Sequence, residues 1–308
     1  MTQKWYAIAN PIAGKNNYKQ QHIKIHSYLK YFNIEYEFKI TEYHKHEIEI
    51  VYGAIRKGYT HFISIGGDGT LHYIVNGVMK QNIISQNKIV IGVIPIGTGN
   101  DWIKTYNIDN DIKKSIEIIK KVNTEYQDIG FLELKNTSRY FNNVAGIGYD
   151  GYIVSNMDKL KNLGAISYLI SSISAIISYK KNKYEIKVNN ETIKEKCLMI
   201  LFGICKYSGG GMKLTSYSSS SNGLFDITIA KNLNILDLIK NLRGLYNGSI
   251  INHKKISTYK STSLLIVPKN QNLSSFIEAD GELVGSGSVK VSIYNKAIQF
   301  VVNKPFYG

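Results

Sequence analysis

Three glycines surround one carboxylate and one hydroxyl in the run Gly66-Gly67-Asp68-Gly69-Thr70, which follows a strand-like apolar segment at residues 61–65. Glycine lets backbone N–H groups approach an anion closely, in turns that a side chain would forbid. An aspartate among these N–H groups would repel a phosphate unless a divalent cation lay between them. The combination predicts a nucleoside triphosphate bound with Mg²⁺, and therefore phosphoryl transfer.

Two further loops have a similar character, at residues 10–15 and 97–101, and each follows an apolar run. The carboxyl ends of parallel strands share one edge of an open α/β sheet, where ligands bind. A helix that begins after Thr70 would add its N-terminal dipole to phosphate binding. One such loop alone is equally well explained as a tight turn, but three together predict a single nucleotide site.

The elements that must position these loops alternate between strand and helix. Residues 1–128 predict strands at 5–10, 35–40, 61–65 and 89–95 and helices at 17–31, 47–57, 71–79 and 112–121. Alternation of this kind is typical of a doubly wound parallel sheet. Residues 129–295 predict mainly strands, at 131–134, 139–144, 183–188, 196–204, 224–230, 264–267 and 289–294. Helical stretches near 155–179 and 235–248 interrupt them, and the pattern predicts an antiparallel β-sandwich. The terminal strand within 296–308 is expected to join the first domain.

Composition limits the class of protein. The chain has 308 residues, 44% of them hydrophobic, and a formal net charge of +15. We find no signal-peptide pattern and only two cysteines, Cys197 and Cys205, which we expect to be small core residues in a reducing cytoplasm. Residues 163–178 are apolar but too short to span a membrane, so we expect an amphipathic or buried helix there, with a helix that lines a lipid entry path as the alternative. The positive charge has three explanations: a solvated lysine-rich surface, binding to nucleic acid, or binding to an anionic membrane. The sequence contains no recognisable nucleic-acid-binding module.

The order of six segments resembles the diacylglycerol kinase catalytic-domain family, which includes sphingosine, ceramide and bacterial lipid kinases. The segments are NPIAGK at 10–15, SIGGDGTLHYIVNGV at 64–78, IPIGTGNDW at 94–102, AGIGYDG at 145–151, NGLFDI at 222–227 and EADGE at 278–282. The resemblance implies an N-terminal domain like that of NAD kinase and phosphofructokinase, with ATP in the cleft beside a β-rich domain. It also implies transfer of the γ-phosphoryl group to a lipid hydroxyl. By itself the GxGxxG match within 146–151 is weak, and we interpret it as a bend or a close-packing site.

By position, the resemblance assigns residue roles. It places ATP against the three loops, their following turn of helix and one threonine: Asn10, Pro11, Gly14, Thr41, Gly66, Gly67, Asp68, Gly69, Thr70, Leu71, Gly97, Thr98 and Asn100. Asp68 and Asp101 would hold the catalytic Mg²⁺, partly through water. Bacterial relatives often carry a structural Mg²⁺ on an aspartate where this chain has Asn222, so a site at Asn222 and Leu224 is expected to be weakened.

Transfer to an alcohol also needs an acceptor for the hydroxyl proton. Glu278, Asp280 and Glu282 offer carboxylates, with Gly281 forming a turn between the last two. The resemblance places the base on Asp280 or Glu282. We favour Glu282 as the proton acceptor, with Asp280 orienting it or the metal.

The sequence therefore predicts an ATP- and Mg²⁺-dependent lipid kinase that converts diacylglycerol to phosphatidic acid. The alternatives are a kinase of a sphingoid base or another lipid alcohol, an NAD kinase, and an inactive nucleotide or lipid sensor. We expect a cytoplasmic protein at the inner membrane face, in peripheral contact with anionic lipid and without nucleic acid. Whether it forms a homodimer stays open.

Overall fold

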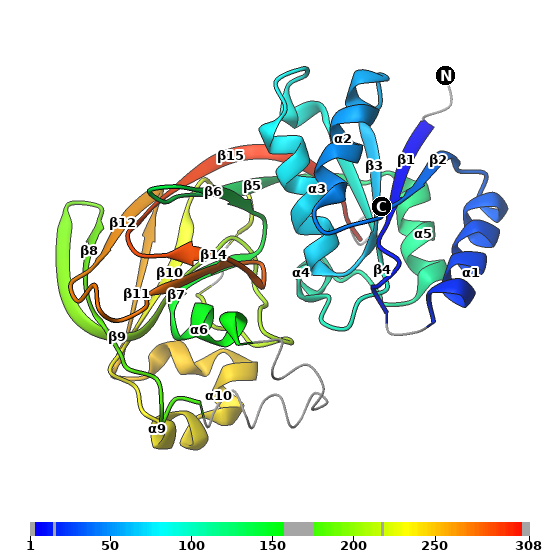
Figure 1. Ribbon diagram of the computed structural model, residues 1–308. Helices are drawn as coiled ribbons and strands as arrows, with labels where there is room; N and C mark the ends of the chain where they lie inside the picture. Colours follow the sequence, from blue (N-terminus) through cyan, green and yellow to red (C-terminus); the bar gives the residue numbers. More distant parts are fainter. Residues whose placement is uncertain (1–3, 15–16, 157–174, 217–218, 304–308) are drawn as a thin grey trace. The chain divides into compact units, whose positions relative to one another are not determined.

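The computed structural model describes residues 4–14, 17–156, 175–216 and 219–303. The chain divides into two compact units. Unit 1 comprises Met1–Ile129, Ser220–Asn222 and Asn295–Gly308, and unit 2 comprises Gly130–Ser219 and Gly223–Tyr294. An α/β unit and a β-rich unit confirm the predicted fold class (Figure 1).

Unit 1 is a parallel sheet in the order β15-β4-β3-β1-β2. Its own strands are β1 (Lys4–Ala9), β2 (Glu35–Ile40), β3 (His61–Gly66) and β4 (Val90–Pro95). The end of β15 (Val289–Val301) pairs with β4 through Gln299 and Phe300. Strand β1 pairs with β2 on one side and with β3 on the other. The chain therefore runs outward from β1 to β2 and then returns to continue at β3, so the direction of winding reverses between β1 and β3. Ligands bind at such a reversal, beyond the carboxyl ends of the strands.

Helices cover both faces of this sheet. They are α1 (Tyr18–Tyr31), α2 (His46–Arg56), α3 (Asp68–Lys80), α4 (Asp101–Thr105), α5 (Ile112–Lys121) and a short 3₁₀ turn η1 (Gln86–Lys88). Figure 1 shows α1 beside α5 on one face and α2 beside α3 on the other. Because both faces are covered, β3 and β4 are buried almost throughout. The predicted strands and helices of this half are confirmed, although α3 begins three residues earlier than the expected position 71.

Unit 2 is mainly antiparallel. Its strands are β5 (Thr124–Glu133, shared with unit 1), β6 (Ser138–Phe141), β7 (Val144–Gly148), β8 (Lys183–Val188), β9 (Glu191–Gly203), β10 (Phe225–Lys231), β11 (Ile256–Ser261), β12 (Ser263–Pro268), β13 (Phe276–Ala279) and β14 (Glu282–Ser286). Strand β9 belongs to two groups, pairing with β8 up to Lys196 and with β10 from Cys197. The buried rings of Phe141, Phe202 and Phe225 pack together between the strands.

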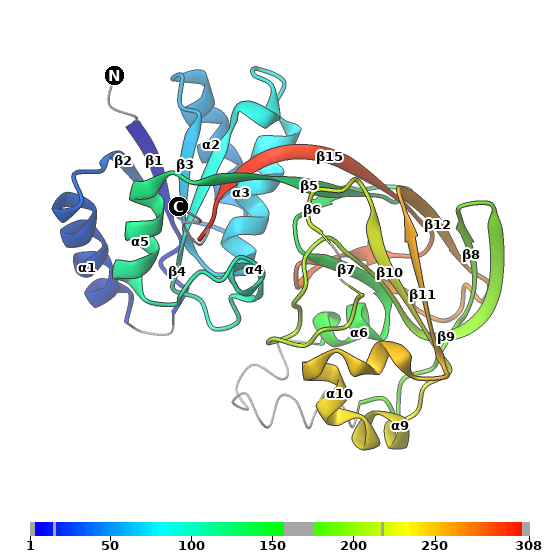
Figure 2. The same ribbon diagram turned by 180° about the vertical axis from the view of Figure 1, so that it is seen from behind.

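The described residues of unit 2 also form four short helical elements: α6 (Tyr149–Ser155), α9 (Ile235–Lys240), α10 (Leu242–Asn247) and the 3₁₀ turn η3 (Ser249–Asn252). Figure 2 shows α6, α9 and α10 on the same side of the strands. A second apolar cluster lies there, with Leu198 and Leu201 of β9 beneath Leu238 and Leu245 of the helices.

Several details differ from the sequence predictions. The expected strand at 139–144 is two strands, separated by a turn at Asn142–Asn143, because both asparagine N–H groups bind a distant carboxylate. Residues 289–301 form one strand because β15 pairs first with β12 and then with β4. The helix expected at 235–248 is two helices interrupted at Asn241. Part of the apolar segment at 163–178 lies outside the described residues, and no described helix is long and apolar enough to cross a membrane.

Candidate functional site

The loop after β3 is built around Gly66 and Gly67. Gly67 precedes α3 in an extended conformation, and α3 begins at Asp68. A Cβ on Gly66 would lie 2.2 Å from the hydroxyl oxygen of Thr70, so a side chain there would displace the first turn of the helix. The 13-residue helix α3 therefore begins directly in the glycine loop. Its N-terminal N–H groups belong to the loop, an arrangement suited to binding phosphate.

The loops after β3 and β4 touch through their backbones. The N–H groups of Ile96 and Gly97 both donate to the carbonyl oxygen of Gly66, at 2.9 and 3.2 Å. A Cβ on Gly97 would lie only 2.5 Å from the Cα of Gly67. The close approach therefore requires glycine at position 97, whereas a Cβ on Gly67 would make only a tight contact, 3.3 Å from the Cα of Gly97. The structure brings these two predicted loops together.

Asp68 joins the two loops chemically. Its Oδ2 accepts a hydrogen bond from the N–H of Asp101 at 3.0 Å, and its Oδ1 accepts one from Trp102 at 3.1 Å. The carboxylate therefore caps the N-terminus of α4, where the helix dipole favours negative charge. Asp101 lies in that first turn and its Oδ1 accepts from Lys104 at 2.6 Å. The sequence analysis identified both aspartates but missed this capping bond, because its partners are far apart in the chain.

The first loop reaches the same edge of the sheet. The N–H of Asn10 donates to Ile65 of β3, and its side-chain oxygen accepts from Ile12 at 3.1 Å. Gly14 has a φ of +85°, and a Cβ there would lie 2.6 Å from the carbonyl oxygen of Ile96. Thr41 is buried beside them and donates its N–H to Ala9 at 2.9 Å. All three glycine loops thus lie at the β1–β3 reversal.

The predicted nucleotide residues divide into two kinds. Some are partly exposed at the loop edge and able to meet a ligand, namely Gly67, Asp68, Gly69 and Gly97, together with the exposed Thr98. Three others, Thr70, Leu71 and Asn100, are buried, so their side chains support the loops from behind. The amide of Asn100 does so by donating to the carbonyl oxygen of Gly97 at 2.8 Å. Any nucleotide contact by Leu71 would have to come from its backbone.

The donor chemistry at this edge fits Mg²⁺. Two carboxylates, Asp68 and Asp101, are held together by the capping bond. Mg²⁺ typically takes one or two carboxylates and completes its shell with phosphate oxygens and water. Within the described parts of the chain, no group of three or more His, Cys, Asp or Glu residues is placed to hold a metal by itself. Asn222 is exposed, and a structural Mg²⁺ at Asn222 and Leu224 stays a prediction.

Unit 2 carries the other predicted carboxylates on the β13–β14 hairpin. Asp280 has a φ of +52°, and its two carboxylate oxygens accept the N–H groups of Asn142 and Asn143 at 3.0 and 2.9 Å. The N–H of Asp280 donates to Val144 at 2.9 Å. These bonds fix the turn, so that Glu282 begins β14 in a defined, half-buried position.

Behind this hairpin lies a carboxyl pair that the sequence analysis did not identify. Glu278 is fully buried and accepts the N–H of Gly281 at 2.8 Å. Burial, followed by the neighbouring charge of Asp150, raises the pKa of Glu278 well above its usual value. Burial likewise raises the pKa of Asp150, in the first turn of α6, and the two side chains share a hydrogen bond. Two carboxyl groups in such contact titrate as a coupled pair, in which the charge of one disfavours the ionisation of the other.

Glycines bring Asp150 to this position. Gly148 precedes α6 with a φ of +108°, and a Cβ on Gly151 would lie 2.4 Å from the carbonyl oxygen of Phe276 in β13. The interpretation of this GxGxxG run as a close-packing site is therefore confirmed. No sequence signal links Asp150 to Glu278, since only the packing of α6 on β13 places them together.

Comparison with known families and structures agrees with this geometry. Residues 4–132 match the model of the diacylglycerol kinase catalytic domain, and residues 143–302 match the YegS C-terminal NAD kinase beta sandwich-like domain. A diacylglycerol kinase of Staphylococcus haemolyticus is 27% identical over 98% of this chain and 88% of its own. A Staphylococcus carnosus relative is 30% identical over 79% of this chain and 77% of its own.

Solved structures with the same fold are also known. The crystal structure of a diacylglycerol kinase from Bacillus anthracis has a TM-score of 0.73 and covers 98% of this chain and 97% of its own. Its sequence is 18% identical, so the likeness extends to the fold.

Proposed function

Since the chain belongs to the diacylglycerol kinase catalytic-domain family, and so to the lipid kinases, we propose that it transfers the γ-phosphoryl group of ATP to the free hydroxyl of diacylglycerol. The product would be phosphatidic acid. The observation that carries the proposal is the meeting of three glycine loops, with Asp68 and Asp101, at the β1–β3 reversal of unit 1.

The proposed reaction needs alignment and charge neutralisation more than covalent chemistry. The hydroxyl oxygen of the lipid forms a bond to the γ-phosphorus as the bond to the bridging oxygen of ADP breaks. Backbone N–H groups of the partly exposed Gly67 and Gly69 would bind phosphate oxygens, while Asp68 and Asp101 would hold Mg²⁺. Bound Mg²⁺ would neutralise the phosphate charge that grows on the leaving group.

We propose Glu282 as the group that accepts the hydroxyl proton. The contacts of Asp280 support this choice, because both of its oxygens already accept backbone N–H groups. Hydrogen bonds of this kind hold the carboxylate in one position and suit a positioning residue. Asp280 would thus hold the turn from which Glu282 acts.

The decisive assay uses purified protein, Mg²⁺ and ATP with a panel of acceptors: diacylglycerol, a sphingoid base, undecaprenol and NAD. We expect phosphatidic acid as the main product. Glu282→Gln should lower kcat by about 100-fold or more, with little change in the KM for ATP. Glu117→Gln on α5 is the matched control and should leave both constants unchanged. Preferential phosphorylation of another acceptor would replace the proposed substrate, and wild-type turnover by Glu282→Gln would remove its proposed role.

A further inference from the structure

Two consecutive helices of unit 2 expose apolar side chains to solvent. Leu236 and Ile239 of α9 are 60% and 55% exposed, and Leu242 and Tyr246 of α10 are 37% and 40% exposed. We call these four residues the α9–α10 surface. Hydrophobic side chains exposed singly are ordinary, but such a group within eleven consecutive positions, 236–246, indicates an interaction site.

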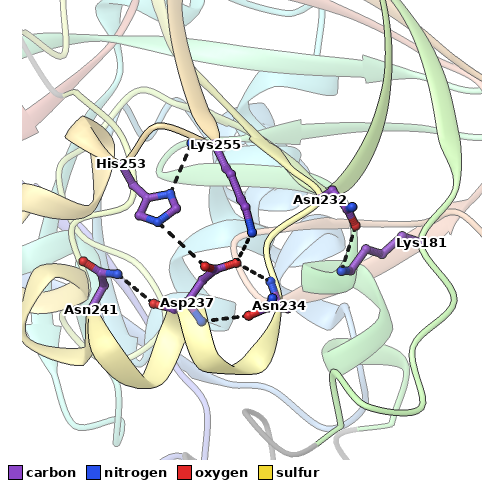
Figure 3. A network of polar contacts seen from close by, with 7 residues as sticks. All are labelled: Lys181, Asn232, Asn234, Asp237, Asn241, His253 and Lys255. Carbon is purple, nitrogen blue, oxygen red and sulfur yellow. Dashed lines mark hydrogen bonds and ion pairs between the residues drawn. The ribbon is translucent and has the colours of Figure 1, made fainter.

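The exposure is not a result of loose packing. Figure 3 shows Asp237 of α9 at the centre of a network of polar contacts. Its carboxylate accepts from the Lys255 side chain and the Asn234 N–H, while its own N–H donates to the Asn234 side chain at 2.9 Å. The amide of Asn241 donates to the carbonyl oxygen of Asp237 at 2.8 Å, which links α9 to α10. These contacts, with Leu238 and Leu245 in the core, fix which side of each helix faces outward.

Positive charge surrounds the apolar residues. Asp237 is the one acidic residue in the sequence between Asp226 and Glu278, and Lys255 already binds it. Lys240 and Arg243 are exposed on the two helices themselves. An open groove of about 570 Å³ lies along α10, and its lining residues are Lys213, Leu242, Arg243, Tyr246 and Asn247.

We infer that the α9–α10 surface docks on the anionic headgroups of a lipid bilayer. Basic side chains beside a negative membrane contribute roughly 1 kcal/mol each, and apolar side chains among them insert into the boundary layer. A tyrosine between both kinds of group is suited to that interface. An acidic protein or a second copy of the chain would need a matching apolar surface, whereas a bilayer needs only charge and an open face. The inference deepens the proposed function, since it rests on a substrate that resides in a membrane.

Vesicle sedimentation without ATP and without diacylglycerol tests the charge. We expect stronger binding to phosphatidylglycerol-containing vesicles than to pure phosphatidylcholine. The double variant Lys240→Gln/Arg243→Gln should bind anionic vesicles roughly 25-fold more weakly, from about 1 kcal/mol per charge. The control Lys24→Gln/Lys30→Gln removes the same charge from α1 and should bind as the parent protein does. Equal binding by both double variants would overturn the inference.

A fluorescent variant tests the apolar part without relying on loss of binding. The two native tryptophans, Trp5 and Trp102, are buried, so they give a constant background. In Tyr246→Trp the emission should shift to shorter wavelength on anionic vesicles and be quenched by brominated lipid, whereas Tyr31→Trp on α1 should not respond. If the shift follows protein concentration instead of lipid, the surface binds a second copy and the inference fails.

The vesicle-binding assay and the kinase assay test different claims, so one claim can be contradicted while the other holds. Detergent-dispersed diacylglycerol requires no docking, so the Lys240→Gln/Arg243→Gln variant should phosphorylate it at the parent rate. A parent protein that docks on vesicles but phosphorylates no lipid in detergent would contradict the proposed function. A parent protein that phosphorylates the lipid but shows no preference for anionic vesicles would contradict the docking inference.

Discussion

Replacing Gly97 with alanine tests whether the nucleotide site depends on direct contact between two loop backbones. The added Cβ would lie 2.5 Å from the Cα of Gly67, 2.8 Å from the Asn100 side-chain oxygen and 3.1 Å from the Gly67 nitrogen. The nearest contact is backbone, which cannot rotate away, so the loops after β3 and β4 must separate by about 1 Å to reach ordinary van der Waals distance. We expect the free energy of unfolding to fall by about 1–3 kcal/mol, as in other overpacked sites.

The same separation should reduce catalysis. A displacement of about 1 Å in a positioning element can cost roughly 100-fold in rate, so kcat/KM for ATP should fall by that order in Gly97→Ala. Urea unfolding and steady-state kinetics with varied ATP measure the two effects. Gly53→Ala is the matched control, because a Cβ on this exposed helical glycine meets nothing within 4 Å and should stabilise α2 by about 0.5–1 kcal/mol. Parent-like stability and ATP kinetics in Gly97→Ala would refute the reasoning.

Three further changes test other contacts. Asp68→Ala removes the cap of α4, so it should lower the free energy of unfolding by about 1–2 kcal/mol in urea titrations. It also removes a proposed Mg²⁺ ligand and should lower turnover by at least about 100-fold. Intact turnover would contradict the metal role. Gln127→Leu leaves the buried indole N–H of Trp102 without its 2.9 Å partner and should cost about 1–3 kcal/mol by the same titration, with an unchanged KM for ATP. The raised pKa of Glu278 keeps a proton that the unfolded chain releases, so stability should fall as pH rises above about 4.5 toward the native pKa, by at most about 1.4 kcal/mol per pH unit for each proton. Glu278→Gln keeps the hydrogen bond to Gly281 and cannot ionise, so thermal melts from pH 5 to 8 should show a flatter slope; an unchanged slope would exclude Glu278 as its source.

Much of unit 1 could be predicted because its signals are local. Runs such as residues 61–65 are mostly apolar because both faces of the sheet are covered, and glycines that favour a turn follow them. The hairpin of unit 2 was identified as a carboxylate-bearing turn for a similar reason, as Gly281 follows Asp280. Pairing partners were harder to predict: the short strands β11, β13 and β14 were missed, because their assignment depends on hydrogen bonds to distant strands.

The sequence alone determined the family, the fold class and the chemistry of the candidate loops, because glycine, aspartate and threonine at fixed local spacing already restrict the backbone and the ligand. Only the tertiary structure decided what each carboxylate does. Asp68 caps a helix that starts 33 positions later, and Asp280 fastens the Asn142–Asn143 turn. The contact of Glu278 with Asp150 depends on how closely α6 approaches β13. Hydrogen-bond partners far apart in the chain are set by the path of the backbone, and residue periodicity carries no record of that path.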